Sequence, residues 1–283
     1  MTSTRIGPIT FAWGARTYVM GILNVTPDSF SGDGLLATAD PVQAAVEQAR
    51  RMAAEGADLL DIGGESTRPG HETVDAGAEA ARVVPVVAAV RAALPAMPIS
   101  IDTTKPAVAE TALDAGADLI NDVWGVGADE GLVRLAAARR VPMVVMHNRA
   151  KAVYEDLMSE IVADLRAALD RAVRLGVEPG DLIIDPGFGF GKTAEHNLVL
   201  LRDLADLRTL AHPILLGASR KSTLGLVLDL PADERLEATI ATTALGIAGG
   251  ADIIRVHDVE ANVRAARMSD AVVRGTWHPS PSV

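Results

Sequence analysis

The sequence predicts an α/β fold, a single eight-stranded TIM (β/α)8 barrel, on three observations. Apolar segments of about five residues alternate with helical stretches of about 10 to 20 residues along almost the whole chain. Polar side chains gather at the C-terminal ends of the apolar segments and are scarce at their N-terminal ends. The tripeptide Gly-Ala-Asp recurs at residues 56–58, 116–118 and 250–252, each time between a helix and a strand. A barrel whose active site lies at the carboxyl ends of its strands explains all three.

Each predicted strand is a short apolar segment that ends on or beside a small or polar residue. These segments end near Asn24, Gly63, Asp102, Asp122, His147, Asp185, Gly217 and His257. Ahead of the first of them, residues 9–11 and 17–20 predict a short N-terminal β-hairpin around residues 13–15. An open, doubly wound sheet is the alternative fold, but it more often has fewer strands and a switch-point motif.

The predicted helices follow the strands in regular alternation. They comprise residues 41–55, 75–94, 106–115, 130–139, 154–175, 194–207, 235–248 and 259–273. Pro41 and Pro106 stand at a first helical turn, where the missing backbone N–H costs little. The glycines of the Gly-Ala-Asp repeat are expected to end helices in the left-handed conformation.

The composition limits the class of protein. The 283 residues suffice for one large barrel, so we expect one domain over residues 1–274 and a flexible tail over residues 275–283. A net charge of −11, without a basic patch interleaved with aromatic residues, argues against nucleic-acid binding. The chain has no cysteine, which excludes disulfides and thiolate metal sites. With no secretory signal and no apolar run of membrane-spanning length, we expect a cytoplasmic protein without membrane contact.

Residues 181–193 carry the clearest signal of a binding site. A buried apolar strand ends there on Asp185, and a loop with glycine at positions 187, 189 and 191 follows. An ionised carboxylate only accepts hydrogen bonds, so Asp185 suits a ligand edge with two parallel N–H groups. The loop misses the Walker A and the dinucleotide-binding patterns by one residue each. The alternative interpretation of Asp185 is a helix-capping aspartate followed by a turn.

The polar residues at the predicted strand ends separate chemically into two sets. The set suited to the edge of a polar heterocycle comprises Asp102, Asn121, Asp185 and Lys221. The set suited to an anion comprises Arg68, Arg255, His257 and either Ser66 or Thr67. A pyrophosphate group normally brings Mg²⁺, for which Asn24 and Asp28 are the expected oxygen ligands. We therefore expect a site that is half for a heterocycle and half for an anion.

Three features stay open to more than one interpretation. His147 is either a site residue or an ordinary buried residue of the barrel, and Asn148-Arg149 after it match no known pattern. The basic stretch at residues 217–222 is either a ligand contact or a solvated helix N-terminus. Because two cations at that position oppose the helix dipole, the stretch favours an anionic partner nearby.

Seven sequence blocks, each at a predicted strand end, resemble the dihydropteroate synthase family of the folate pathway. They begin at Gly21, Asp61, Ser100, Ile120, Asp185, Gly217 and Arg255. The resemblance extends over about residues 18–273. It implies a barrel, usually a homodimer, and a transferase that joins 6-hydroxymethyl-7,8-dihydropterin diphosphate to p-aminobenzoate. The products would be 7,8-dihydropteroate and pyrophosphate, with Mg²⁺ on the diphosphate and sulfonamides as inhibitors.

The resemblance also implies a role for each matching residue. The pterin would contact Asp102, Asn121, Asp185 and Lys221. The diphosphate would contact Asn24, Thr67, Arg68, Arg255 and His257, with Mg²⁺ on Asn24. The p-aminobenzoate pocket would consist of Pro69, Phe190, Lys221 and Ser222. The implied catalytic residues are Asp33, Arg68, Lys221, Arg255 and His257. Gly32 displaces Asp33 by one residue from the usual family position.

Two other functions are alternatives at this stage. A methyltetrahydrofolate:corrinoid methyltransferase would share the barrel and the Asp/Asn contacts to pterin. It would have no need of Arg68, Lys221 or the pair Arg255 and His257, whose presence argues against it. A pterin-binding paralogue without turnover would keep every contact, and only the displaced Asp33 favours it.

Overall fold

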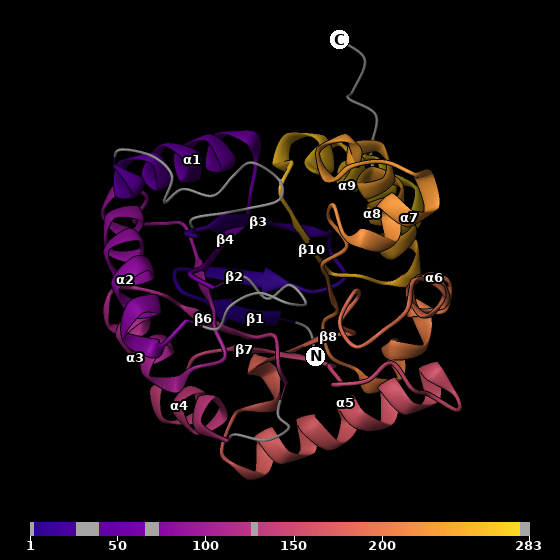
Figure 1. Cartoon of the computed structure of the whole chain (residues 1–283), viewed down its shortest axis with the longest axis horizontal. Coiled ribbons are helices and arrows are strands. Elements are labelled where there is room, and N and C mark those ends of the chain that lie inside the picture. The colour runs from indigo at the N-terminus through magenta and orange to yellow at the C-terminus, as the bar shows by residue number, and fades with distance from the viewer. Residues whose placement is uncertain (1–2, 27–39, 66–73, 126–129, 278–283) are drawn as a thin grey trace.

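Eight parallel strands form a barrel at the centre of the structure, a computed structural model that describes residues 3–26, 40–65, 74–125 and 130–277 (Figure 1). The strands pair in the order β8-β7-β6-β5-β4-β3-β10-β9, and a parallel bridge between Ile184 and Ile214 joins the two ends of this row. Their bounds are β3 (Tyr18–Asn24), β4 (Leu59–Gly63), β5 (Ile99–Asp102), β6 (Leu119–Asp122), β7 (Met143–Met146), β8 (Leu182–Asp185), β9 (Leu215–Leu216) and β10 (Ile253–Val256). The predicted barrel is confirmed, and every predicted strand end lies within one residue of the observed end.

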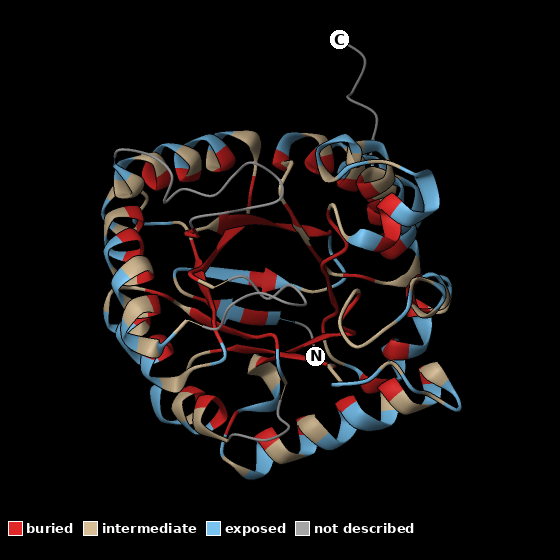
Figure 2. Cartoon of the chain, viewed as in Figure 1, coloured by how far each residue is buried: buried red, intermediate tan, exposed pale blue. Residues whose placement is uncertain are grey.

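Helices surround the barrel, with buried residues on the side of the strands and exposed residues on the outside (Figure 2). They are α1 (Pro41–Glu55), α2 (Ala76–Ala93), α3 (Pro106–Asp114), α4 (Gly131–Arg139), α5 (Leu157–Arg174), α6 (Ala194–Arg202), α7 (Ser222–Leu228), α8 (Leu236–Gly249) and α9 (Val259–Val273). Short 3-10 helices lie at Pro179–Asp181, Leu204–Leu210 and Ala232–Glu234. Within the described ranges, no helix is long and apolar enough to cross a membrane.

The helix predictions need correction in three places. The helix predicted over residues 154–175 begins only at Leu157, where Asp156 caps α5 by accepting the backbone N–H of Ser159. The predicted helix over residues 194–207 ends earlier, because α6 stops at Arg202 and a 3-10 helix follows. Leu204, Leu207 and Leu210 are buried at a spacing of three, which places them on one side of a 3-10 helix. Helix α7 was not predicted, since its sequence contains a glycine and ends in three apolar residues that are exposed rather than alternating with polar ones.

The Gly-Ala-Asp repeat has the same structural role at all three places. Its glycines, at positions 56, 116 and 250, have φ angles of 101°, 114° and 105°, as expected for left-handed residues at helix ends. Each aspartate accepts a hydrogen bond from a backbone N–H near the start of a neighbouring strand: Asp58 from Val19 at 2.8 Å, Asp118 from Ile99 at 2.9 Å and Asp252 from Ile214 at 3.1 Å. The repeat therefore anchors the amino ends of the strands.

The N-terminal hairpin is present, but its strands differ from the prediction. β1 (Ser3–Ile6) pairs antiparallel with β2 (Ile9–Ala12), and the turn between them contains Gly7 at a φ of 55°. Residues 17–20 were predicted as the second hairpin strand. Thr17 instead precedes β3 of the barrel, and residues 18–20 are the first three residues of that strand. The prediction was wrong because the backbone groups of β3 pair with β4 and β10 on its two sides.

The hairpin closes the amino-terminal end of the barrel. Ile6 and Phe11 are fully buried, and the Phe11 ring centroid lies 4.6 Å from that of Tyr18. Figure 1 shows β1 and β2 within the ring of strands. Ile6 and Phe11 belong to one apolar cluster with the barrel residues Tyr18, Met20, Leu59, Leu119, Val144, Ile183, Leu215 and Ile253. We call this cluster the apolar half of the barrel interior.

Two residues further along the strands, the interior becomes polar. Side chains on a strand alternate between its two faces, so residues two apart point the same way. The apolar Leu59, Leu119, Ile183 and Ile253 are thus followed by Asp61, Asn121, Asp185 and Arg255. These four, with Asp102 from β5, form what we call the polar half of the barrel interior. This is the end of the barrel at which the strands finish and the predicted site residues gather.

Candidate active site

Arg255 joins three other side chains in the polar half. Its Nε donates to Oδ2 of Asp61 at 2.6 Å, and its Nη2 donates to Oδ2 of Asp102 at 2.7 Å. Nδ2 of Asn121 donates to the same Asp61 oxygen at 3.0 Å. The planar guanidinium group presents its N–H donors in fixed directions, which suits contact with two carboxylates on different strands. The sequence analysis assigned Asp102 to the heterocycle set and Arg255 to the anion set. In the structure these two residues contact each other.

The polar half has acceptor atoms that the described residues do not use. Oδ1 of Asp61 and Oδ1 of Asp102 are buried, and neither has a hydrogen-bond partner in the described part of the chain. Burial raises the pKa of Asp102 to about 7; the charges of Asp61 and Glu79 add to the shift, and Arg255 opposes it. Buried acceptors are normally hydrogen-bonded, so these oxygens suit a ligand that presents several N–H donors.

Asp185 and Lys221 form the opposite side of the polar half. Oδ1 of Asp185 accepts the backbone N–H of Gly187 at 2.7 Å. Burial raises the pKa of Asp185, while the Lys221 cation opposes this shift. Lys221 donates to the carbonyl oxygen of Phe188, and its Nζ lies 4.1 Å from the centroid of the Phe190 ring. Burial lowers the pKa of Lys221 to about 7, with Asp185 opposing. Lys221 thus links the barrel interior to the glycine-rich loop.

In the basic stretch after β9, Ser219 and Arg220 contact residues that follow β10, whereas Lys221 approaches the polar half of the barrel interior. Oγ of Ser219 lies 2.9 Å from Nδ1 of His257 and accepts its backbone N–H at 3.2 Å. Arg220 forms an ion pair with Asp258 at 2.6 Å. The chain therefore supplies an anionic partner for Arg220 itself, and Lys221 is the cation that approaches Asp185 and Asp102. Ser222 is the first residue of α7.

Several predicted site residues fall outside the described residues: Asp28, Asp33, Ser66, Thr67, Arg68 and Pro69. Asn24, the expected magnesium ligand, is the last residue of β3 and pairs in register with Gly63. No cluster of three His, Cys, Asp or Glu side chains in the described ranges could hold a metal ion. The side-chain amide of Asn24 offers an oxygen of the kind that Mg²⁺ prefers as a ligand.

Asp61 is a residue of this hydrogen-bond network that the sequence analysis left out of the site. It is fully buried and accepts hydrogen bonds from both Arg255 and Asn121. A signal existed, because Asp61 is the fifth residue after Gly56, as Asn121 is after Gly116 and Arg255 is after Gly250. The repeat thus places three of the network residues at equivalent strand positions.

Comparisons with known proteins agree with this geometry. The model of the family described as "Pterin binding enzyme" matches residues 20–257. The dihydropteroate synthase of Clostridium beijerinckii is 48% identical, over 95% of this chain and 99% of that protein. The dihydropteroate synthase of Clostridium difficile, solved in the presence of pteroic acid, superposes with a TM-score of 0.88 at 47% identity, covering 93% of this chain and 98% of that one.

A third relative is a drug complex. The dihydropteroate synthase of Yersinia pestis, solved with a sulfonamide drug, superposes with a TM-score of 0.90 at 39% identity, covering 95% of this chain and 98% of that one. The matches extend over nearly the full length of each protein. The chain therefore belongs to the dihydropteroate synthase family of pterin-binding enzymes.

Proposed function

We propose that the chain condenses 6-hydroxymethyl-7,8-dihydropterin diphosphate with p-aminobenzoate in the polar half of its barrel, giving 7,8-dihydropteroate and pyrophosphate. The observation that carries this proposal is the row of buried acceptors at the carboxyl ends of the strands. Oδ1 of Asp61 and Oδ1 of Asp102 have no partner in the described residues, and Asp185 lies in the same interior. A pterin ring offers the N–H donors that such acceptors need.

The pterin ring is the part of the substrate that this interior suits. Asp102, Asn121 and Asp185 would face its polar edge, and Lys221 would add a cationic donor. All three strand residues are buried, so a bound ring would be removed from water and its hydrogen bonds strengthened. Asp61 would fix the orientation of Asn121 and Arg255 through its Oδ2, and its Oδ1 would be a further acceptor for the ligand.

The diphosphate would lie at the mouth of the barrel. Its proposed contacts are Asn24, Thr67, Arg68, Arg255 and His257, and Asn24 would hold Mg²⁺ on the diphosphate oxygens. A magnesium ion in this position would neutralise charge on the leaving group. Of these residues, Arg255 already contacts Asp102, so the pterin and diphosphate subsites are proposed to share a side chain.

The p-aminobenzoate pocket would lie beside the glycine-rich loop. Its proposed residues are Pro69, Phe190, Lys221 and Ser222. Lys221 lies over the Phe190 ring, which places a cation and an aromatic face where a benzoate would bind. Sulfonamides are expected to compete for this pocket, since a sulfonamide drug is bound to the Yersinia pestis relative.

The proposed reaction separates charge and then forms one bond. The C–O bond between the pterin methylene and the diphosphate breaks, pyrophosphate leaves with the electron pair, and the cation delocalises into the ring. Arg68, Arg255 and His257 would stabilise the leaving group, and Asp185 the pterin. Asp33 is proposed as the acidic residue of the first loop. The amine of p-aminobenzoate attacks while neutral, so no strong general base is needed to form the C–N bond, and its surplus proton leaves to solvent.

The test is pyrophosphate release from the pterin diphosphate by the purified chain with Mg²⁺, with and without p-aminobenzoate. We expect release and dihydropteroate formation in equal amounts, and loss of both with Asp185→Asn. Binding without release would contradict the proposed turnover and would identify a paralogue that only binds pterin. Transfer of a methyl group from methyltetrahydrofolate would contradict the proposed substrates.

We also propose that the chain forms a homodimer through α7, α8 and α9 and acts in the cytoplasm. These helices expose large apolar side chains, among them Leu226 at 72%, Leu245 at 58%, Met268 at 65% and Val272 at 73% of their surface. Helices α8 and α9 pack against each other, so their exposed residues contribute to one region of the surface. A second copy of the chain would cover it. Light scattering should give twice the monomer mass, and Leu245→Glu should give the monomer mass.

A further inference from the structure

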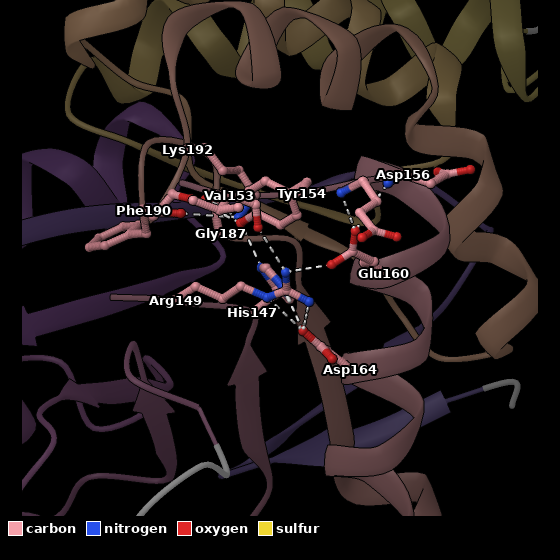
Figure 3. A network of polar contacts seen from close by, with 12 residues as sticks. His147, Arg149, Val153, Tyr154, Asp156, Glu160, Asp164, Gly187, Phe190 and Lys192 are labelled. Carbon is pink, nitrogen blue, oxygen red and sulfur yellow. Dashed lines mark hydrogen bonds and ion pairs between the residues drawn. The ribbon is translucent and has the colours of Figure 1, made fainter. Parts of the chain in front are cut away.

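Lys192 contacts the backbone of the glycine-rich loop between β8 and α6 and the side chain of His147 (Figure 3). The proposed reaction gives these contacts no role. Its Nζ donates to the carbonyl oxygens of Gly187 and Phe190, both at 3.1 Å, and lies 2.9 Å from Nδ1 of His147. In its charged form the Lys192 amine has three N–H donors and no acceptor, so these contacts use all three. Lys192 therefore joins two points of the loop to each other and to the residue that follows β7.

The contact with Lys192 assigns the tautomer of His147. Since Nδ1 accepts from the ammonium group, the ring proton lies on Nε2, which donates to Oδ2 of Asp164 at 3.2 Å. Burial and then the Lys192 charge lower the pKa of His147 to about 4, so the ring is neutral at ordinary pH. Arg149 donates to the same Asp164 oxygen at 2.7 Å and forms an ion pair with Glu160 at 2.6 Å. We call these five residues the Lys192 network.

The loop backbone fits closely against this network. Gly187 and Gly191 have φ angles of 70° and 56°, which glycine adopts without strain. A Cβ atom on Gly187 would collide with the carbonyl oxygen of His147, and one on Gly191 would collide with that of Arg149. The two segments therefore meet backbone to backbone, with the lysine ammonium group beside them.

Other side chains hold the remaining part of the loop. Lys221 donates to the carbonyl oxygen of Phe188, and Tyr154 donates to that of Gly191 at 2.9 Å. Together with the two bonds from Lys192, the carbonyl oxygens at positions 187, 188, 190 and 191 all accept from side chains. The conformation of this loop is therefore set by Lys221 and Tyr154, which lie outside it, and by Lys192 at its end. Phe190 is part of this loop.

We propose that Lys192 is a positioning residue for the p-aminobenzoate pocket, fixing the loop that presents Phe190 and that Lys221 contacts through Phe188. This inference rests on the proposed function, because it assigns Phe190 and Lys221 to the amine pocket. It also gives a role to His147 and Arg149, which belong to the Lys192 network. Asn148 lies outside that network and donates to the carbonyl oxygen of Val123 at 3.2 Å.

The electrostatics support a positioning role rather than a purely stabilising one. Burial lowers the pKa of Lys192 to about 7; the Asp185 and Asp164 carboxylates oppose the shift, while the Lys221 and Arg149 cations add to it. A half-buried lysine beside two other cations is costly for the fold. Groups with such perturbed environments concentrate at functional sites.

The effect should fall on p-aminobenzoate more than on the pterin. Asp102, Asn121 and Asp185, which are proposed to hold the pterin, are residues of the barrel strands, and Asp185 contacts the loop only where the loop begins, at the backbone N–H of Gly187. Phe190 lies in the loop itself, between Gly187 and Lys192. Loosening the loop would therefore disturb the amine pocket first.

The experiment compares Lys192→Met with Lys151→Met in the full-length chain. Methionine is similar in length to lysine but cannot donate to the two carbonyl oxygens, whereas Lys151 is exposed and lies in a loop. For Lys192→Met we expect the KM for p-aminobenzoate to rise about tenfold, as the loss of a charge-assisted hydrogen bond predicts. The KM for the pterin diphosphate should change less than about twofold, and Lys151→Met should leave both unchanged.

A second measurement does not depend on activity. Amide hydrogen exchange over residues 187–191 should accelerate in Lys192→Met and, to a smaller extent, in Asp164→Ala, where the partner of His147 is lost. Asp164 has 47% of its side chain exposed, so this second variant is expected to fold. Unchanged exchange together with an unchanged KM for p-aminobenzoate would overturn the inference, as would equal increases in both KM values. Wild-type protein that makes no dihydropteroate would instead contradict the proposed function and leave the exchange result to decide the positioning of the loop.

Discussion

The two halves of the barrel interior differ in polarity and in hydrogen bonding, although their residues are only two positions apart on the same strands. The apolar half is closed by Ile6 and Phe11 of the hairpin, and all its side chains are buried hydrocarbon or aromatic groups. The polar half holds Asp61, Asp102 and Arg255 in direct contact and has acceptor oxygens that no described residue uses. Within the barrel interior, the apolar half therefore contributes hydrophobic burial, and the polar half is left for a ligand.

This division is not complete, because Arg255 belongs to both stability and function. Its guanidinium group neutralises Asp61 and Asp102 in the interior, and it is also a proposed diphosphate contact. The following experiments test whether the halves separate, from the largest expected effect to the smallest.

Arg255→Met should produce the largest change. It leaves two buried carboxylates without their cation, and breaking a buried ion pair in this way lowers the free energy of unfolding by about 3–5 kcal/mol. We also expect weaker binding of both pyrophosphate and free pterin, since Asp102 would then be protonated over more of the pH range. Urea unfolding and calorimetry measure the two effects, with Arg264→Met on exposed α9 as control. Loss of pyrophosphate binding with intact pterin affinity would show that the two subsites are separate after all.

Phe11→Ala should affect stability alone. Removing a fully buried aromatic side chain from the apolar half should lower the free energy of unfolding by about 3–5 kcal/mol, through lost burial and the cavity left behind. The KM values of the protein that remains folded should not change. Ile9→Ala on the same strand, 39% exposed, is the control and should cost much less. A rise in the KM for the pterin diphosphate would mean that the apolar half also shapes the site.

Asp185→Asn should affect binding far more than stability. The amide presents a donor where the carboxylate accepted, so we expect pterin affinity to fall by about 2–3 kcal/mol, roughly 30- to 150-fold. Isothermal titration with the free pterin measures this directly. Asp181→Asn, near the other end of the same strand, should leave the affinity unchanged, and an equal effect of the two substitutions would remove Asp185 from the proposed site.

The pH dependence of pterin affinity should show the smallest effect. Because burial raises the pKa of Asp102 to about 7, its carboxyl group is protonated below that pH and ionised above it. Affinity should therefore rise about tenfold between about pH 6 and about pH 8, as binding linked to the loss of one proton requires. The same raised pKa means that the unliganded fold loses stability as pH rises from the ordinary carboxyl pKa of 3.8 to about 7, since the charged form is the one that burial disfavours. Asp102→Asn should weaken or abolish both trends, and an unaltered pH profile in that variant would assign them to another group.

The barrel was predictable because its signals are local. Each strand is a short apolar run with a distinct polar or glycine end, and each Gly-Ala-Asp repeat marks one helix end and one strand start. The N-terminal hairpin was predicted, but the partner of its strand at residues 9–11 was not, because Ser3 to Ile6 is only four residues long and nothing in so short a segment identifies its partner. Which of two candidate strands pairs with β2 depends on the barrel, whose strands occupy both edges of β3.

The site was predictable as a set of residues but not as a network. Asp102, Asn121, Asp185 and Lys221 could be named because strand ends in a barrel converge. Asp61 was missed because its importance lies in a contact with Arg255, which is 194 residues away in the sequence. The Lys192 network was missed for the same reason, since it joins the end of β7, helix α5 and the loop after β8.

The most direct test of the two-halves description is a crystal structure of the chain with 6-hydroxymethyl-7,8-dihydropterin diphosphate. We predict that the pterin edge lies within hydrogen-bond distance of Asp102, Asn121 and Asp185, that the diphosphate lies at the mouth near Arg255, and that the apolar half is unchanged. A pterin bound elsewhere, with Oδ1 of Asp61 and Asp102 still unpartnered, would contradict the assignment of the polar half to substrate binding.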